Sequence, residues 1–249
     1  MPSADRNRSW SWRVEPTGPA IGKALEVGYA LRAAVLEAAA KVGLDRMPED
    51  LHSSGSEGGH RHAYWLSEDR DRDGAIDHVT LFAESGIDPD FARALQATHG
   101  FCLDTRHFGL QQAEAGFRRE GGLFGPAAVW MAATPFVTRL WRLTKTGKVR
   151  ADCTPSAQLC REIADLEDFD RRRRLPEPAG IGWLPAIAVG GELKSATDFL
   201  LKTEHSQPPG DAVAGFPIVT FAEPVRGPIA IGYGAHFGLG LLIPLDAEP

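Results

Sequence analysis

Cysteine is scarce in this chain, and several features that define whole classes of protein are missing from it. The three cysteines, Cys102, Cys153 and Cys160, include no C-x-x-C pair and cannot all be matched in disulfides. This argues against a disulfide framework and favours a reducing, cytoplasmic setting in which the thiols pack as small hydrophobic groups. No run of eighteen apolar residues occurs, and the opening MPSADRNRSWSW has no apolar stretch. Neither a membrane span nor a secretory signal is therefore expected.

An excess of basic residues is also lacking. The 249 residues carry 27 Lys and Arg against 33 Asp and Glu, a net charge of −6. This balance weakly disfavours a nucleic-acid binder, but phosphates are bound by local cationic patches and not by the average charge. Residues 139–150 contain five cations and no acid: Arg139, Arg142, Lys145, Lys148 and Arg150. Such a run is either a solvated loop or a phosphate-binding segment.

The hydrophobic pattern predicts an α+β protein built from two similar halves. In the first half, strands are expected at 11–16, 60–66, 76–83 and 107–112, and helices at 18–43 and 88–100. The resulting order β-α-β-β-α-β is the ferredoxin-like pattern. In the second half, a strand, a helix and two further strands are expected at 127–137, 154–169, 180–189 and 215–234. We therefore predict two tandem ferredoxin-like modules, 1–120 and 121–249, the second without a clear second helix.

Residues at the helix ends support these segments. Asp88 and Thr154 are each followed by proline, which is typical of a helix N-cap with proline in the first turn. Gly43 and Gly100 are natural helix stops.

The stretch GHRHAYWLSEDRDRDGAIDHV, residues 59–79, is the richest in side chains that can do chemistry. His60 and His62 are spaced so that a strand places both rings on one face, together with Tyr64. One imidazole can accept a proton while another donates one, and cleavage of RNA by its own 2′-OH needs both steps and no metal. For any single ring, packing or surface exposure is the simpler explanation.

The same stretch offers two arrangements for metal ions. The first is a loop spaced to surround a hard cation such as calcium: Asp69, Asp71, Asp73, Gly74 and Asp77. Thr80 stands where an EF-hand has a bidentate glutamate, so a solvated turn is the preferred explanation. The second is zinc held by His60, His62 and His78. His78 is expected near residues 64–66 on an undefined face, and no further zinc motif accompanies it. We expect no metal and no cofactor.

Four glycines alternate around His236 near the end of the chain: Gly232, Gly234, Gly238 and Gly240. Glycine lets backbone N–H groups approach a phosphate closely, so this segment is a candidate RNA-binding loop. It is not a Rossmann turn, because no helix follows, and not a P-loop, because Gly-Lys-Ser/Thr is absent. A strained turn leading into a strand is the structural alternative.

Together, residues 59–79, WMAATPFV (130–137) and GPIAIGYGAHFGLGLLIP (227–244) resemble the RNA-processing half of a CRISPR-associated fusion protein of type I-U (I-G) systems. That half is a RAMP-superfamily endoribonuclease. The resemblance implies tandem ferredoxin-like (RRM-like) modules with a C-terminal glycine-rich loop. It also implies metal-independent cleavage of CRISPR repeat RNA, leaving a 5′-hydroxyl and a 2′,3′-cyclic phosphate. The expected partners are repeat RNA, mature crRNA and other subunits of a type I effector complex. The cap-subunit half has no counterpart here, which implies a separate processing subunit, a split gene or a shortened chain.

The resemblance leaves the catalytic histidine open. Related endoribonucleases often carry it on or just after the first helix, where this sequence has Lys23 and Tyr29 but no histidine. The remaining candidates are His52, His60, His62 and His236. We take His60 or His62 as the general acid or base and His236 as a group near the scissile phosphate. The cations of 139–150 would bind phosphates of the repeat hairpin, whose A-form shape is recognised. The alternatives are a non-catalytic crRNA-binding subunit and a calcium-loaded structural module.

Overall fold

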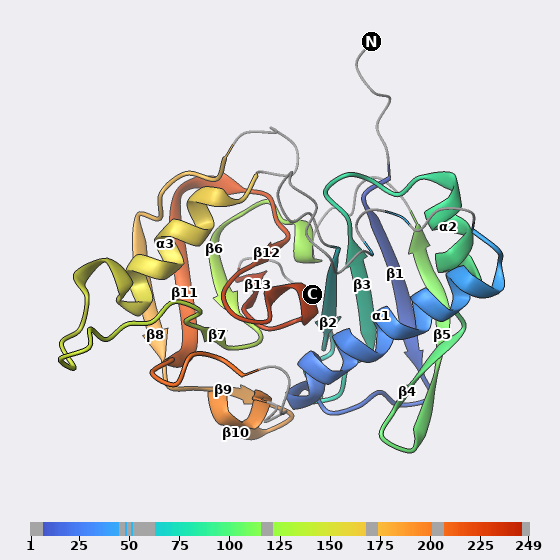
Figure 1. Cartoon of the computed structure of the whole chain (residues 1–249), viewed down its shortest axis with the longest axis horizontal. Helices are drawn as coiled ribbons and strands as arrows, with labels where there is room; N and C mark the ends of the chain where they lie inside the picture. Colours follow the sequence, from blue (N-terminus) through green and yellow to red (C-terminus); the bar gives the residue numbers. More distant parts are fainter. Residues whose placement is uncertain are drawn as a thin grey trace, which may run out of the picture. The chain divides into compact units, whose positions relative to one another are not determined.

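The computed structural model describes residues 7–44, 48, 51, 63–115, 122–167, 174–200 and 207–245. The chain divides into two compact units (Figure 1). Unit 1 comprises Met1–Arg118 and His236–Gly238, and unit 2 comprises Arg119–Ala235 and Leu239–Pro249. Three residues of the glycine-rich segment therefore belong to unit 1. Across the described ranges, no helix is both long and apolar enough to cross a membrane.

Unit 1 is a five-stranded antiparallel sheet with helices on one face. Its elements are β1 (Ser9–Glu15), α1 (Ala24–Lys41), β2 (Tyr64–Glu68), β3 (His78–Phe82), α2 (Pro89–Gln96), β4 (Gly100–Leu103) and β5 (Arg106–Ala115). The strands lie in the order β2-β3-β1-β5-β4. Figure 1 shows α1 and α2 in front of this sheet. Because β4 is a hairpin partner of β5, the remaining elements follow the predicted β-α-β-β-α-β order.

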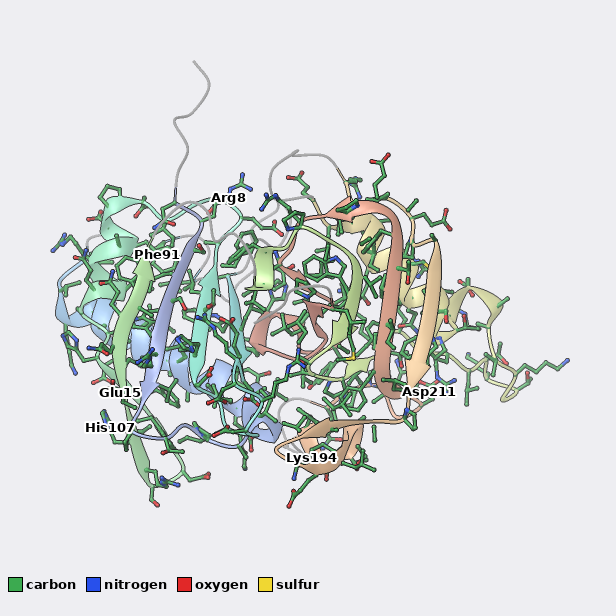
Figure 2. The ribbon with its side chains drawn as sticks, turned by 180° about the vertical axis from the view of Figure 1, so that it is seen from behind. Arg8, Glu15, Phe91, His107, Lys194 and Asp211 are labelled. Carbon is green, nitrogen blue, oxygen red and sulfur yellow. The ribbon has the colours of Figure 1, made fainter. Side chains whose placement is uncertain are left out.

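Alternation along β1 shows which face of this sheet forms the core. Trp10, Trp12 and Val14 are buried, whereas Arg13 and Glu15 are exposed. Successive side chains of a strand point to opposite faces, so the tryptophans line the face that the helices cover. Figure 2, seen from behind, shows the opposite face, with Glu15 at the end of β1. The buried side chains of this face fix the sheet under α1 and α2.

Unit 2 is also an α+β unit, and it has one α-helix among its described residues. Its elements are β6 (Ala127–Ala132), β7 (Phe136–Val137), α3 (Pro155–Asp165), β8 (Gly180–Leu184), β9 (Ala186–Val189), β10 (Glu192–Ser195), β11 (Ala214–Val225), β12 (Ile229–Ala230) and β13 (Leu241–Pro244). The main sheet has the order β12-β13-β6-β11-β7, and β8 also pairs with β11. Unit 2 thus repeats the plan of unit 1, without a counterpart of α2 among its described residues. The elements that repeat it are β6, α3, β8, β11 and β13.

Three predicted helix ends are confirmed. Asp88 caps α2, since its Oδ1 accepts a hydrogen bond of 2.7 Å from the N–H of Phe91. Thr154 caps α3 in the same way, with its Oγ1 3.2 Å from the nitrogen of Ala157. Gly43 follows the end of α1 with a φ of 64°, the left-handed conformation that ends helices.

The first helix begins later than predicted. Its α-helical part starts at Ala24 and not at Gly18. The N–H of Ile76 donates to the carbonyl of Pro19 at 2.7 Å, so the chain before the helix pairs with the loop between β2 and β3. A side chain at position 18 would collide with the carbonyl oxygen of Ile76. This glycine therefore serves a close approach of two backbones.

Two residues of β4 also differ from prediction. Gly100 does not end α2 but begins β4, where a Cβ atom would lie 2.5 Å from a carbon of the His107 ring. It is glycine because of this strand contact. Cys102 is exposed, whereas Cys153 is buried, so the expectation that the thiols pack in the core is wrong for Cys102.

Candidate functional site

A histidine–tyrosine pair lies in unit 1, where residues 236–238 contact α1 and β2. The ring centroids of His236 and Tyr64 are 4.3 Å apart, with the planes inclined by 33°. Tyr29 of α1 stacks on Phe237 with centroids 4.0 Å apart. Tyr29 is exposed, and His236 and Tyr64 are partly exposed, so this aromatic group reaches the surface. Imidazole is a side chain that can both accept and donate a proton.

Gly28 makes room for this segment inside α1. A Cβ atom at position 28 would stand 2.6 Å from the carbonyl oxygen of Phe237, closer than real Cβ atoms approach. Gly238 has a φ of 95°, and its Cβ position lies 3.3 Å from the carbonyl oxygens of Ala24 and Trp65. Gly28 was not among the predicted site residues. The sequence did carry a signal for it. An isolated glycine inside a helix lowers the stability of the helix by about 1 kcal/mol relative to alanine, so its presence points to close packing at that position.

A lysine, Lys23, stands immediately before α1, six residues ahead of Tyr29. Lys23 Nζ lies 2.6 Å from Glu26 Oε1, and the hydrogen bond of this pair raises the pKa of Lys23. Glu26 precedes Tyr29 by three residues, which places both on the same side of the helix. The Lys23 side chain is 45% exposed. A fixed cation is thus available one to two turns along α1 from Tyr29.

The predicted position of His78 is wrong. Tyr64 pairs with Phe82 and Glu68 pairs with His78, so His78 lies at the far end of β2 and not beside residues 64–66. His78 Nδ1 is 3.0 Å from Asp77 Oδ1. Burial acts to raise the pKa of Asp77, but hydrogen bonds from His78 and from the N–H of Arg70 outweigh it and lower this pKa. His52, His60 and His62 lie outside the described residues.

Glu68 explains why β2 ends later than predicted, at residue 68 and not at 66. Its carboxylate is buried and accepts hydrogen bonds of 2.5 Å from Thr80 Oγ1 and 2.9 Å from Arg70 Nη2. A buried carboxylate requires such partners. The chain therefore stays extended through Glu68, and the turn to β3 begins only afterwards.

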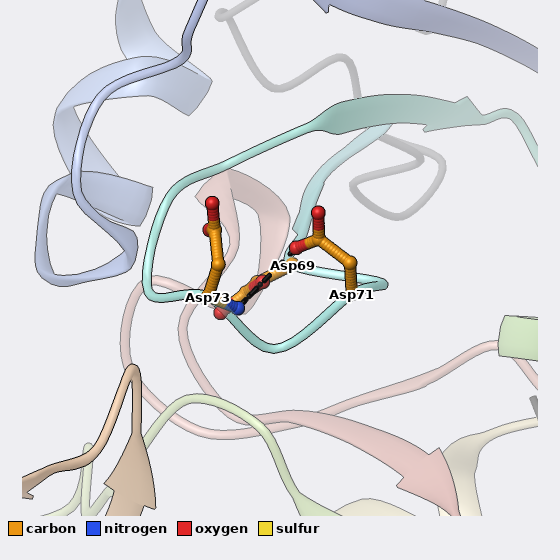
Figure 3. A group of neighbouring side chains, drawn as sticks. All are labelled: Asp69, Asp71 and Asp73. Atoms are coloured by element: carbon orange, nitrogen blue, oxygen red, sulfur yellow. Dashed lines mark hydrogen bonds between the residues drawn. The ribbon is translucent and has the colours of Figure 1, made fainter.

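The acidic loop between β2 and β3 brings three carboxylates together. Asp69, Asp71 and Asp73 offer oxygen atoms that all lie within 4.8 Å of one another (Figure 3). The same carboxylates accept hydrogen bonds from the loop backbone, including 2.9 Å from Gly74 N to Asp69 Oδ2 and 2.7 Å from Ala75 N to Asp73 Oδ1. These bonds are those of an aspartate-rich turn.

Protonation of this loop depends mainly on Asp69. Burial, reinforced by the neighbouring carboxylates, raises the pKa of Asp69 to about 6, against the lowering effect of the Gly74 N–H. Asp71 and Asp73 are exposed. The oxygens are of the kind that calcium prefers. The hydrogen bonds from the loop N–H groups to these carboxylates are enough to explain the conformation of the turn.

The glycine-rich segment in unit 2 is packed against its own backbone. Gly232 and Gly240 have φ values of 95° and 62°, and Cβ atoms there would lie 2.7 Å from Val137 O and 1.7 Å from Ile231 O. The Gly232 N–H donates to Glu162 Oε2 at 2.6 Å, and the Gly240 N–H donates to Pro135 O at 2.9 Å. A phosphate contact at either N–H would have to replace a hydrogen bond that the chain already makes. Gly234 and Gly238 also have positive φ, 73° and 95°.

The five predicted cations lie on one projecting segment of unit 2, residues 139–150, here called the basic arm. It is the loop between β7 and α3 in Figure 1. Leu143 and Val149 form a β-bridge, so residues 143–149 make a small hairpin. Lys145 and Lys148 are exposed in it.

Three arginines of the basic arm make contacts within unit 2. Arg139 Nε is 3.1 Å from Glu162 Oε1, Arg142 Nε donates to Asp211 O at 2.8 Å, and Arg150 Nη2 is 3.4 Å from Asp152 Oδ2. The two lysines are therefore the cations best placed to bind phosphate.

No family model matches the chain, and no curated protein matches it. Solved structures are similar to it over nearly its whole length. One described as a Cas6 product complex is 12% identical with a TM-score of 0.46 and covers 96% of this chain and 100% of its own. A RAMP protein binding different RNA substrates is 14% identical with a TM-score of 0.43 and the same coverage. A Cas6-related gene product from Pyrococcus furiosus is 13% identical with a TM-score of 0.41, covering 97% and 100%. Two of these neighbours are thus described as Cas6 or Cas6-related, and one as a RAMP protein.

Proposed function

We propose that this protein is an endoribonuclease that cleaves CRISPR repeat RNA to mature crRNA without a metal ion. The observation that carries the proposal is the His236–Tyr64 pair of unit 1, with ring centroids 4.3 Å apart. It places a proton-exchanging ring inside a motif that resembles the glycine-rich loop of RAMP endoribonucleases. The basic arm supplies a surface for the phosphates of the RNA.

The proposed chemistry uses only the RNA and protein side chains. A general base removes the proton of the 2′-OH, and the 2′ oxygen attacks the adjacent phosphorus. The bond from phosphorus to the 5′ oxygen breaks, and a general acid gives that oxygen a proton. The products are a 2′,3′-cyclic phosphate and a 5′-hydroxyl. Cations that face the phosphorane lower the barrier by stabilising its negative charge.

In this proposal His236 acts beside the scissile phosphate, and His60 or His62 is its acid–base partner. The Tyr64 ring lies against the His236 imidazole, and Tyr64 follows His62 by two residues in the sequence. Lys23, held by Glu26, is a cation on the same unit. Lys145 and Lys148 of the basic arm bind phosphates of the repeat hairpin, and its A-form shape provides recognition.

Single-turnover cleavage of repeat RNA in EDTA tests the proposal. Positioned acid–base groups contribute about 10² to 10⁴ in rate, so His236→Ala should slow cleavage by about that factor with RNA affinity within a few-fold. His60→Ala and His62→Ala identify the partner. His107→Ala is the matched control, because His107 is an exposed histidine on β5 and should leave the rate unchanged.

The substrate provides a second test. A 2′-deoxy or 2′-methoxy group at the cleavage site should abolish cleavage and leave binding intact. Cleavage of that modified RNA, or a requirement for magnesium, would refute the mechanism. Tight binding of repeat RNA without any cleavage in EDTA would instead support a non-catalytic crRNA-binding subunit.

A further inference from the structure

The basic arm is fixed at its base by two side chains that the sequence did not single out. Gln158 of α3 is buried, and its Oε1 accepts hydrogen bonds from the N–H groups of Arg139 and Leu140, at 3.1 and 3.0 Å. Asp211 Oδ2 accepts from the N–H groups of Arg142 and Leu143, at 2.7 and 2.6 Å. Figure 2 labels Asp211 beside the start of the projecting loop. The backbone on both sides of residue 141 is therefore held in place.

Trp141 stands between these two anchors with its ring in solvent. It is 61% exposed, more than any other Trp, Tyr or Phe in the described ranges. Its ring lies over Gly210, where a Cβ atom would be 3.8 Å from the ring. Trp183 is different: its Nε1 donates to Ser156 Oγ at 3.0 Å, and its ring packs near Phe136 with centroids 5.9 Å apart. The Trp141 ring thus presents a large flat surface at a fixed position. No described residue covers most of it.

The charge around Trp141 identifies what can cover it. The basic arm contains five cations and no acid, and the acids that touch it, Glu162, Asp211 and Asp152, are engaged with its arginines or its backbone. A cationic segment with an exposed indole matches a ligand that carries phosphates and flat rings together. RNA has both, and base stacking on an aromatic side chain works for any base that is not paired.

We propose that Trp141 is a stacking platform for an unpaired base of the RNA that the basic arm holds. This deepens the proposed function, on whose RNA binding it rests, and it requires no cleavage. The lysines then contact phosphates on either side of the stacked nucleotide. The arm would recognise the place where single-stranded RNA meets a hairpin.

The test compares two RNAs, a blunt hairpin and the same hairpin with a single-stranded flank that contains 2-aminopurine. Wild-type protein should quench the 2-aminopurine and bind the flanked RNA more tightly than the blunt one. Stacking on one aromatic side chain corresponds to about a 5- to 150-fold change in affinity. Trp141→Ala should lose that preference and the quenching, and Trp141→Phe should keep part of both. The salt dependence of binding should not change, because every cation of the arm is still present.

Leu193→Ala is the matched control, since Leu193 is 78% exposed on β10 and its removal should change neither RNA affinity nor quenching. Equal losses on blunt and flanked RNA in Trp141→Ala would overturn the proposal, because the ring would then only support the arm. Unchanged binding of both RNAs would also overturn it and assign this surface to another partner. Cleavage measured on the same samples separates the two proposals: stacking without cleavage refutes the endonuclease, and cleavage without stacking refutes the platform.

Discussion

Replacing Glu162 tests how the glycine-rich segment is held in unit 2. The carboxylate is buried, and it accepts hydrogen bonds from Gly232 N at 2.6 Å and Arg139 Nε at 3.1 Å. Glu162→Ala leaves the buried Gly232 N–H without an acceptor, which costs about 1–3 kcal/mol. It also loses the partly exposed ion pair to Arg139, which contributes about 0–1 kcal/mol. Relief of the buried charge offsets part of this loss. We expect a net loss of about 1–3 kcal/mol in the free energy of unfolding of unit 2.

Glu162→Gln separates the hydrogen bond from the charge. Glutamine still offers Gly232 an oxygen acceptor and loses only the ion pair to Arg139, whose side chain is 55% exposed. Ion pairs that are this exposed contribute about 0–1 kcal/mol, so the loss should stay within about 1 kcal/mol.

The pH dependence of the two proteins should differ as well. Burial raises the pKa of Glu162 above its usual 4.5 in the folded state. The folded protein therefore binds this proton more tightly than the unfolded chain. The resulting stabilisation is complete below the ordinary pKa and is lost as the pH rises through the folded value. Glu162→Gln lacks this loss, so its stability relative to wild type should improve towards neutral pH.

Urea denaturation at acidic and neutral pH measures these differences, with exchange of the Gly232 amide as a local readout. Glu192→Gln is the matched control: Glu192 pairs with Lys194 at 2.6 Å on an exposed hairpin, and its replacement should not change unfolding measurably. Equal destabilisation by glutamine and alanine at 162, or exchange of the Gly232 amide at the wild-type rate in Glu162→Ala, would show that Glu162 does not hold this segment.

Three further predictions concern unit 1 and the basic arm. Gly28→Ala should slow RNA cleavage by about 10²-fold or more, the effect of losing one positioned acid–base group, because a Cβ atom there displaces the backbone of residues 236–238 from α1; an unchanged cleavage rate contradicts the placement. Changing Lys145 and Lys148 to alanine should lower the slope of log K against log salt by about 0.7 to 0.9 for each phosphate that is no longer bound, equally for cognate and unrelated hairpins; weakened binding of the cognate RNA alone means that they read bases. Asp71→Asn with Asp73→Asn should leave cleavage and melting temperature nearly unchanged with calcium or EDTA, because asparagine keeps the Oδ1 acceptor; a clear drop in wild-type melting temperature on chelation would show a bound ion.

The sequence predicted most elements because their signals are local. Asp88 and Thr154 cap helices through bonds to residues three positions on, and burial alternates in the second half of β1, from Trp12 to Glu15. The start of α1 was missed because it depends on Ile76, which is distant in the chain. The role of Gly100 was missed because it depends on the pairing of β4 with β5, which brings His107 against it.

The site was predicted less completely than the fold for the same reason. The sequence marks His236 as unusual through its glycines, but it cannot show that the partner rings come from α1 and β2. Gly28 carried a readable signal. No sequence signal marked Glu162, Gln158 or Asp211. Each looks like an ordinary polar residue until the backbone N–H groups that it binds are known.

The membership of His236–Gly238 in unit 1 has a consequence for how the protein is made. Domains generally fold in order as the chain leaves the ribosome. The sheet and helices of unit 1 can form early, but the ring that meets Tyr64 is synthesised only after almost all of unit 2. The proposed nuclease site therefore lacks His236 until almost all of unit 2 has been synthesised. On the proposed function, a nascent or prematurely terminated chain that has folded its N-terminal half does not cut RNA, including the message from which it is being translated.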